Sequence, residues 1–183
     1  PRRAPAGAAG DAAACDPERL LKLALDIGDD LLARACRDEH RSNWLTLECA
    51  DERHWTVMPM GAGLADGYCG TALFLAELGR LSGSERHLEA ADRAVRALPA
   101  LVRLLARNPD LAAAVGPGGF FGVGGVCYAA ARLSTLLDSQ DLAAAVPQAL
   151  EALEAACPSA GADVAHGTAG ALLAAEAVRD ETG

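Results

Sequence analysis

The sequence is poor in aromatic residues and in positive charge. Phe, Trp and Tyr together make up 4% of its 183 residues, and 16 Lys and Arg stand against 25 Asp and Glu, for a formal net charge of −9. Nucleic-acid backbones are bound by clustered Lys and Arg, so this balance argues against nucleic-acid binding. No run of about 18 uncharged apolar residues occurs, and we therefore expect no insertion into a membrane.

Cysteine occurs six times, but never as a Cys-x-x-Cys pair and never followed by His. Free cysteines are often buried, and the first residues carry basic charge without the apolar segment of a secretory signal. We therefore expect reduced thiols in a cytoplasmic protein. Residues 1–15 are dominated by small residues and are interpreted as a linker. The first residue is Pro1 rather than Met, which indicates part of a longer protein or a processed product.

Alanine, leucine and other apolar residues reach 51% of the chain, a composition that favours helices over strands. Asp16 and Pro17 are typical of a helix start, and the residues after them form an apolar stripe. Residues 44–47 are expected to be extended and the rest of the segment up to Gly63 to be a loop. Pro99 and Pro147 lie inside helical patterns and should each kink or restart a helix.

A glycine motif recurs three times. The segments are "DGYCGTALFLAEL" from Asp66, "FGVGGVCYAAARL" from Phe121 and "HGTAGALLAAEAV" from His166, and each reads x-G-x-x-G before an apolar helix. The paired glycines are Gly67 with Gly70, Gly122 with Gly125, and Gly167 with Gly170. Recurrence at roughly 50 residues indicates a repeat architecture.

The repeats predict two layers of helices. The motif helices are apolar on all sides and should lie inside, whereas the amphipathic segments that follow the first two should lie outside. The first glycine of each pair would adopt backbone angles forbidden to other residues, and the second would allow close approach of a neighbour. We therefore expect an all-α fold, a partial α/α toroid (an incomplete α/α barrel), over residues 16–183.

The three motifs, together with "ALDIGDDLLARACRDEHRSNWLTL" before them, resemble the cyclase domain of lanthionine synthetases. The resemblance covers residues 17–180 and is greatest to the C-terminal half of the bifunctional (class II) lanthipeptide synthetases, which also carry a dehydratase domain. It implies the N-terminal part of an α/α toroid that acts on a ribosomal precursor peptide. A peptide Cys thiol adds to a dehydrated Ser or Thr, and a zinc ion held by Cys and His activates that thiol.

The resemblance also assigns residues. Asp163 fills the place of the family's acid in the third repeat. His166 precedes a glycine, as the family's catalytic His does. The catalytic His of the family lies in a fourth repeat, however, whereas His166 lies in the third, so a catalytic and a structural role both stay open. The family's zinc ligands come from later motifs, and nothing of that form occurs here. Cys69 and Cys127 are the weaker alternative as ligands. We therefore expect this segment to hold no zinc and to be inactive alone.

Two other functions fit a helical repeat. One is a carbohydrate-active enzyme with an α/α toroid, which needs paired carboxylates and usually aromatic residues that stack on sugars; the scarcity of aromatic residues argues against it. The other is a non-catalytic binding module whose glycines serve packing alone. His40, His54 and His87 lie among charged residues and are expected at the surface.

Overall fold

The structure is a computed structural model that describes residues 16–51, 53–158 and 160–183. The predicted linker 1–15 lies outside these residues. The chain is mainly helical, so the all-α prediction is confirmed. In order, the elements are α1 (Pro17–Arg34), β1 (Cys36–Arg37), β2 (Ser42–Asn43), β3 (Leu45–Asp51), β4 (His54–Pro59), α2 (Tyr68–Ser82), α3 (Glu85–Val95), α4 (Leu98–Arg107), α5 (Pro109–Val115), α6 (Val123–Leu136), α7 (Gln140–Ala156) and α8 (Thr168–Thr182).

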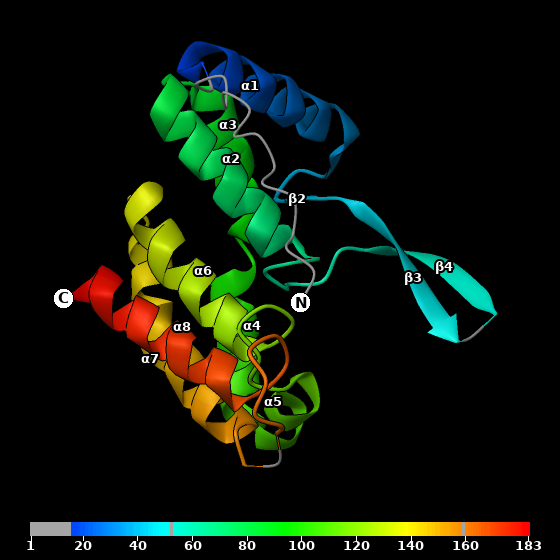
Figure 1. The fold of residues 1–183 in the computed structure, drawn as a ribbon, viewed down its shortest axis with the longest axis vertical. Helices are drawn as coiled ribbons and strands as arrows, with labels where there is room; N and C mark the ends of the chain where they lie inside the picture. Colours follow the sequence, from blue (N-terminus) through cyan, green and yellow to red (C-terminus); the bar gives the residue numbers. More distant parts are fainter. Residues whose placement is uncertain (1–15, 52, 159) are drawn as a thin grey trace, which may run out of the picture.

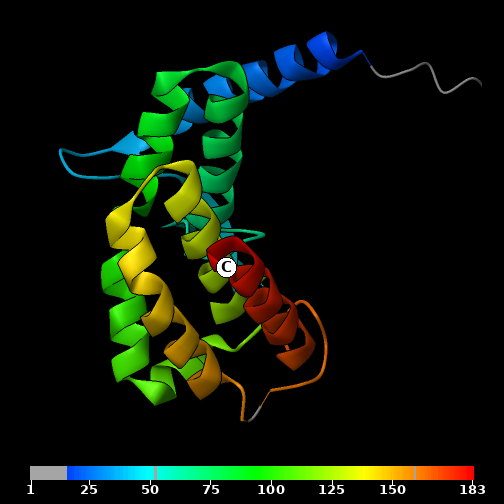
Figure 2. The ribbon, with the colours of Figure 1, turned by 90° about the vertical axis from the view of Figure 1, so that its left-hand side faces the viewer.

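The helices form two layers, as the repeats predict. The motif helices α2, α6 and α8 lie side by side. In the outer layer α3 packs against α2, α7 packs against α6, and α4 lies beside α7 (Figures 1 and 2). The core lies between the layers, where the large side chains Leu75, Leu98, Val102, Val123 and Leu133 are fully buried. Helix α6 has a motif helix on each side, which explains why it is the most completely buried of the three. The closure of such layers into a toroid remains a prediction.

Helix α8 has a motif helix on one side only, α6, in the described part of the chain. Leu172 and Leu173 on α8 are consequently 65% and 54% exposed. None of the helices within the described ranges combines the length and the apolar character that crossing a bilayer requires.

Helix α1 begins as predicted, with the Asp16 carboxylate accepting a hydrogen bond of 3.1 Å from the Glu18 backbone N–H. It lies across the ends of α2 and α3 (Figure 2). The contact uses His87, which is fully buried, so the prediction of a surface position for this residue is wrong. His40 and His54 are exposed, as expected.

The burial of His87 depends on residues far from it in sequence. Its Nδ1 lies 2.7 Å from the Ser84 hydroxyl, and its Nε2 lies 3.2 Å from a carboxylate oxygen of Asp29 on α1. A Cβ at Gly28 would come within 2.9 Å of the same Nε2. A glycine on α1 thus makes room for the ring, and polar groups on two helices hold it.

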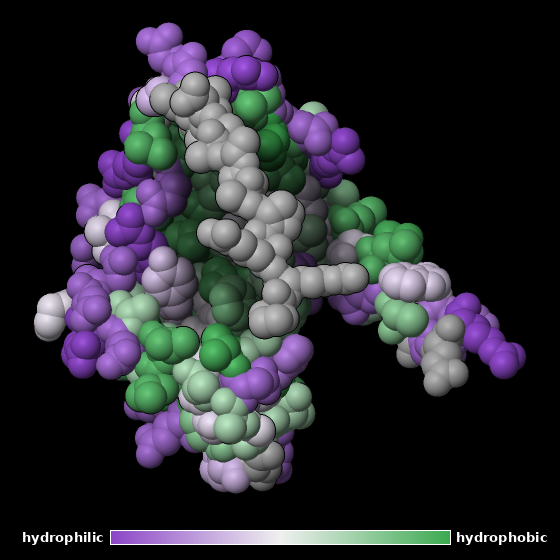
Figure 3. All heavy atoms as spheres, viewed as in Figure 1, coloured by the Kyte–Doolittle hydropathy of each residue, from purple (hydrophilic) through white to green (hydrophobic). Residues whose placement is uncertain are grey.

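The loop expected after residues 44–47 is instead a β-hairpin. Strands β3 and β4 pair antiparallel, with Leu47 opposite Val57 and Cys49 opposite Trp55. Since side chains alternate along a strand, these residues share one face, and Leu47, Val57 and Trp55 are 59–64% exposed. The hairpin projects from the helical body (Figure 1), and apolar side chains gather on it in Figure 3. The extended prediction for 44–47 is right for the residues from Leu45 onward.

The two helix prolines behave differently. Pro99 lies in the first turn of α4, and the chain restarts as a new helix there, as predicted. The prediction of a restart is wrong for Pro147, because α7 runs without interruption from Gln140 to Ala156 around it.

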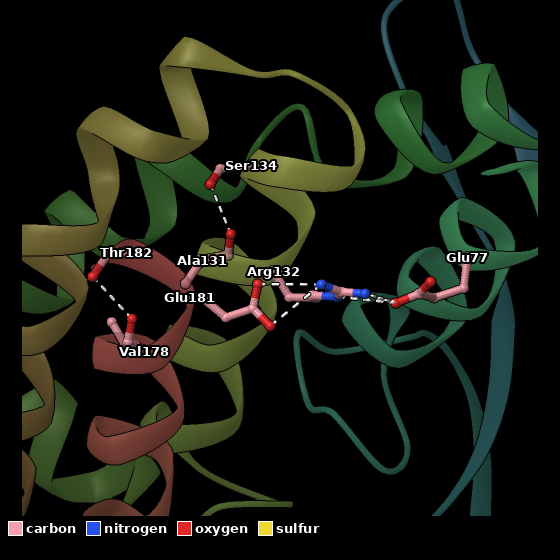
Figure 4. Close-up of polar contacts among 7 residues, drawn as sticks. All are labelled: Glu77, Ala131, Arg132, Ser134, Val178, Glu181 and Thr182. Atoms are coloured by element: carbon pink, nitrogen blue, oxygen red, sulfur yellow. Dashed lines mark hydrogen bonds and ion pairs between the residues drawn. The ribbon is translucent and has the colours of Figure 1, made fainter.

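An arginine connects the three motif helices. Arg132 on α6 donates hydrogen bonds of 2.6 and 2.9 Å to Glu77 on α2, and its Nη1 lies 3.3 Å from a carboxylate oxygen of Glu181 on α8 (Figure 4). The three side chains are 22–39% exposed, so the ion pairs are partly shielded from water. The network fixes the spacing of the inner helices at the end away from the glycine pairs.

Candidate functional site

Each of the three glycine motifs ends a loop, and the three loops have the same backbone geometry. The first loop (residues 61–67), the second loop (116–122) and the third loop (161–167) each begin and end with glycine. In each, the first helical residue donates its backbone N–H to the carbonyl of the opening glycine, at 2.8–2.9 Å: Tyr68 to Gly61, Val123 to Gly116 and Thr168 to Gly161. The repeat identified from the sequence is therefore a repeat of backbone geometry.

The first glycine of each pair works by lacking a side chain. Gly67, Gly122 and Gly167 have φ values of −122°, −145° and −110°, which any residue adopts, so the prediction of forbidden backbone angles is wrong. A Cβ at these positions would collide with backbone atoms near the start of the same loop. Glycine is required here because the loop folds back too closely to leave room for a Cβ, and not because φ is positive.

The second glycine allows close approach, as predicted. A Cβ at Gly70 would overlap the Leu64 carbonyl, and one at Gly125 would lie 2.7 Å from the Gly119 carbonyl oxygen. At Gly170 a Cβ would overlap both Val164 and the backbone N–H of Gly119 in the second loop. The second glycine lets the loop fold onto its own helix, and in the third repeat it also admits the neighbouring loop.

The three loops stack on one another. The Ala65 N–H donates to the Phe120 carbonyl at 3.2 Å, and the Phe120 N–H donates to the Ala165 carbonyl at 3.2 Å. Residues 65, 120 and 165 are equivalent in the three loops, so one bond is repeated at both junctions. The stack places the three loops in a row at the N-terminal ends of α2, α6 and α8.

Asp163 occupies a position that is glycine in the other loops. Its equivalents are Gly63 and Gly118, two residues after each opening glycine. A side chain at Gly118 has no room because the backbone of Ala165 and His166 lies against it. In the third loop the Asp163 side chain is 58% exposed, so the structure accepts a carboxylate there.

The Asp163 carboxylate binds its own loop. It accepts a hydrogen bond of 2.8 Å from the His166 backbone N–H, and the Ala165 N–H also contributes. The equivalent N–H groups of the second loop, on Phe120 and Phe121, donate to Ala165 instead. The hydrogen bond from His166 is the main reason that the pKa of Asp163 lies below its usual value. The side chain is therefore a charged carboxylate at neutral pH.

His166 lies beside this carboxylate and against an aromatic ring. Its Nδ1 is 3.7 Å from an Asp163 oxygen, and its side chain is 70% exposed. The imidazole stacks on Phe121 with a centroid separation of 4.8 Å and an interplanar angle of 12°. The stack orients the ring while leaving its edge open to solvent. The two residues predicted from the resemblance are thus brought together on one exposed loop.

Phe121 was not predicted as part of the site. It stands immediately before the first glycine of its pair, as do Asp66 and His166. Since the loops stack, residues at this position should be neighbours, and the repeat alignment therefore contained the signal. Phe121 is 42% exposed, so it also presents an apolar face to the solvent beside His166.

The described residues do not fit a zinc site. No group of three or more His, Cys, Asp or Glu that could hold a metal occurs among residues 16–51, 53–158 and 160–183. Cys69 and Cys127 are fully buried, and burial raises the pKa of both thiols to about 12. The Cys127 thiol donates to the Ala149 carbonyl at 3.0 Å. Both groups are protonated core thiols, whereas zinc binds thiolates.

Three further cysteines lie in the described part of the chain. Cys36 and Cys49 are exposed, and they lie on the strands of the two small hairpins. Cys157 is half-buried, and its thiol lies 3.2 Å from the Leu153 carbonyl.

Comparison with known proteins supports the assignment from the repeats. The model of the lanthionine synthetase C-like protein family matches residues 58–182, which begin before the first loop and end in α8. No curated protein is similar enough to give a match. The family match covers more than half of the chain and all three glycine loops. The chain belongs to the lanthionine synthetase C-like family.

Proposed function

We propose that this protein takes part in the formation of thioether rings in a ribosomal precursor peptide. The family membership supports a synthetase-type function in general. The observation that carries the finer proposal is the pairing of Asp163 with His166 on the exposed edge of the third loop. As the resemblance implies, residues 16–183 would be part of the cyclase domain, and the same full-length protein would carry a dehydratase domain. We place the reaction in the cytoplasm.

The reaction is an addition without loss of atoms. The sulfur of a peptide cysteine bonds to Cβ of a dehydroalanine or dehydrobutyrine, and the π electrons of the C=C bond move toward the carbonyl as an enolate. A proton is released from the thiol, and one is taken up at Cα. The enzyme therefore has to accept one proton and deliver another at defined positions.

His166 is suited to deliver the proton. An imidazole can both give and accept a proton near neutral pH, and this one is open to solvent on a fixed stack with Phe121. The charged Asp163 carboxylate lies 3.7 Å from Nδ1 of this ring. Because the pKa of Asp163 is lowered, its carboxylate serves as the charge partner rather than as the proton donor.

Zinc is implied by the family, but no step is assigned to it here, because the described donor groups do not fit the ion. The residues of this chain supply the proton-handling side of the reaction. The stacked loops hold these residues at one end of the inner helices.

The test is ring closure of a dehydrated precursor peptide by the full-length protein. Ring closure leaves the peptide mass unchanged, so remaining thiols are counted by alkylation and mass spectrometry. Asp163→Asn keeps an oxygen that can accept the backbone N–H but removes the charge, and His166→Phe keeps an aromatic ring on Phe121 but removes the imidazole. We expect each to slow closure at least about 100-fold, within the usual range for a lost proton-transfer group.

Two controls separate chemistry from loop structure. Asp66→Asn changes the exposed acid at the equivalent of His166 in the first loop and should leave the rate unchanged. Asp163→Ala removes the N–H acceptor as well as the charge. If Asp163→Asn closes rings at the wild-type rate and only Asp163→Ala is slow, Asp163 has a purely structural role. If both residues can be replaced without effect, the chain is a scaffold or binding module at this site.

A further inference from the structure

A small apolar cavity lies beside the stacked loops. Its volume is about 210 Å³. It lies between the first loop, the second loop, α4, the end of α5 and the start of α6, and it is lined by Ala62, Gly63, Leu101, Leu105, Val115, Phe121, Gly122 and Val126. None of these side chains is charged, so the cavity favours an uncharged, apolar occupant.

The cavity adjoins the Asp163–His166 pair through one shared residue. Phe121 forms part of the cavity wall, and its ring stacks on the His166 imidazole with centroids 4.8 Å apart. An extended peptide advances roughly 3.3–3.6 Å per residue. A side chain in the cavity would therefore belong to a residue one or two positions from the residue at His166.

We propose that this cavity binds an aliphatic or aromatic side chain of the precursor peptide next to the reacting residue. That the bound side chain belongs to the precursor peptide rests on the proposed function. The occupant is argued from size and chemistry: a cavity of roughly 150 Å³ lined by apolar residues holds benzene, so 210 Å³ accommodates a leucine or phenylalanine side chain. The half-exposed Phe121 and Val115 at its rim leave the entrance open.

The direct experiment measures binding without any chemistry. N-acetyl-4-fluorophenylalanine amide is titrated with the protein and observed by ¹⁹F NMR. We expect saturable line broadening in the millimolar range, displaced by N-acetyl-leucine amide but not by N-acetyl-aspartate amide. Absence of saturable binding, or equal displacement by the aspartate compound, overturns the proposal.

Variants locate the bound probe. Ala62→Leu and Val115→Phe fill the cavity from the first loop and from the end of α5, and each should weaken binding at least tenfold. Leu111→Phe is the matched control, because it lies on the same helix as Val115, is 41% exposed and does not line the cavity. Circular dichroism verifies that each variant is folded, and either filling variant suffices for the test. Wild-type binding by a folded filling variant contradicts the assignment.

A second measurement links the cavity to the peptide. Dehydrated peptides that carry Leu or Gly beside the dehydrated residue are compared for ring closure, and the Leu peptide should show about tenfold lower KM, as expected for one apolar contact of this size. Val115→Phe should abolish this preference, because KM for the Leu peptide should rise to the value for the Gly peptide. Equal KM values overturn the inference while ring closure itself stands. Failure of every peptide to close refutes the proposed function, and the ¹⁹F titration then still decides whether the cavity binds apolar side chains.

Discussion

Replacing Gly170 by Ala should destabilise the protein although alanine is the better helix former. Gly170 is the third residue of α8, and its new Cβ would be wedged against the Val164 carbonyl and the Gly119 N–H. These two groups form a hydrogen bond of 3.1 Å between the second and third loops. The loops would have to separate, because both colliding atoms belong to the backbone.

The expected cost follows from three contributions. Overpacking in a tight site costs about 1–3 kcal/mol, and the loss of the backbone hydrogen bond between the loops costs about 0.5–1.5 kcal/mol. The helix preference of alanine over glycine offsets at most about 1 kcal/mol. We therefore expect the free energy of unfolding to fall by about 2 kcal/mol. For a protein of this size this lowers Tm by roughly 4–8 °C.

The assay is thermal unfolding followed by circular dichroism at 222 nm. The matched control is Gly161→Ala in the same loop, where the nearest atom to a new Cβ is an Asp163 carboxylate oxygen at 3.8 Å. This control should change stability by less than about 0.5 kcal/mol. A Gly170→Ala protein as stable as wild type, or a control that loses as much, would refute the packing role of the glycine pairs.

Three further outcomes follow from the contacts. Arg132→Met should lower the free energy of unfolding by about 1–2 kcal/mol in urea titrations, because it removes the partly shielded ion pairs that join α6 to α2 and α8; an unchanged midpoint would contradict this. Cys69 and Cys127 should resist iodoacetamide at pH 8 in the folded protein, since burial raises the pKa of both thiols to about 12, and peptide mapping should find them labelled only after unfolding. The backbone N–H groups of His40 and Arg41 hold the pKa of Asp38 at about 2, below its ordinary 3.8. Because the pKa is lower in the folded protein, the stabilising effect of Asp38 is complete above pH 3.8 and is lost as the pH falls through 2. NMR titration of the Asp38 carboxyl carbon checks this pKa.

The layered helices could be predicted because their pattern is local. Each motif helix is largely apolar and begins directly after the first glycine of its pair. Its place in the inner layer could therefore be predicted from its own segment of the sequence. Asp163 and His166 could be assigned from the third motif, and the structure places them side by side. Their roles in ring formation remain predictions.

The remaining features depend on contacts between distant segments. His87 is surrounded by charged residues in sequence, and its burial requires the space that Gly28 leaves on α1. Phe121 becomes part of the site only because the second loop stacks on the third. The hairpin at 45–59 depends on cross-strand pairs, which a search for helical periodicity does not detect.

The proposed function requires that His166, which lies between Asp163 and Phe121, delivers the proton to Cα during ring closure. The most direct measurement is the configuration at that carbon, determined by chiral gas chromatography of the hydrolysed thioether product from wild-type and His166→Phe protein. We expect a single diastereomer from wild type, and slow formation of a mixture from the variant. The same single diastereomer formed by both proteins at the same rate would contradict it.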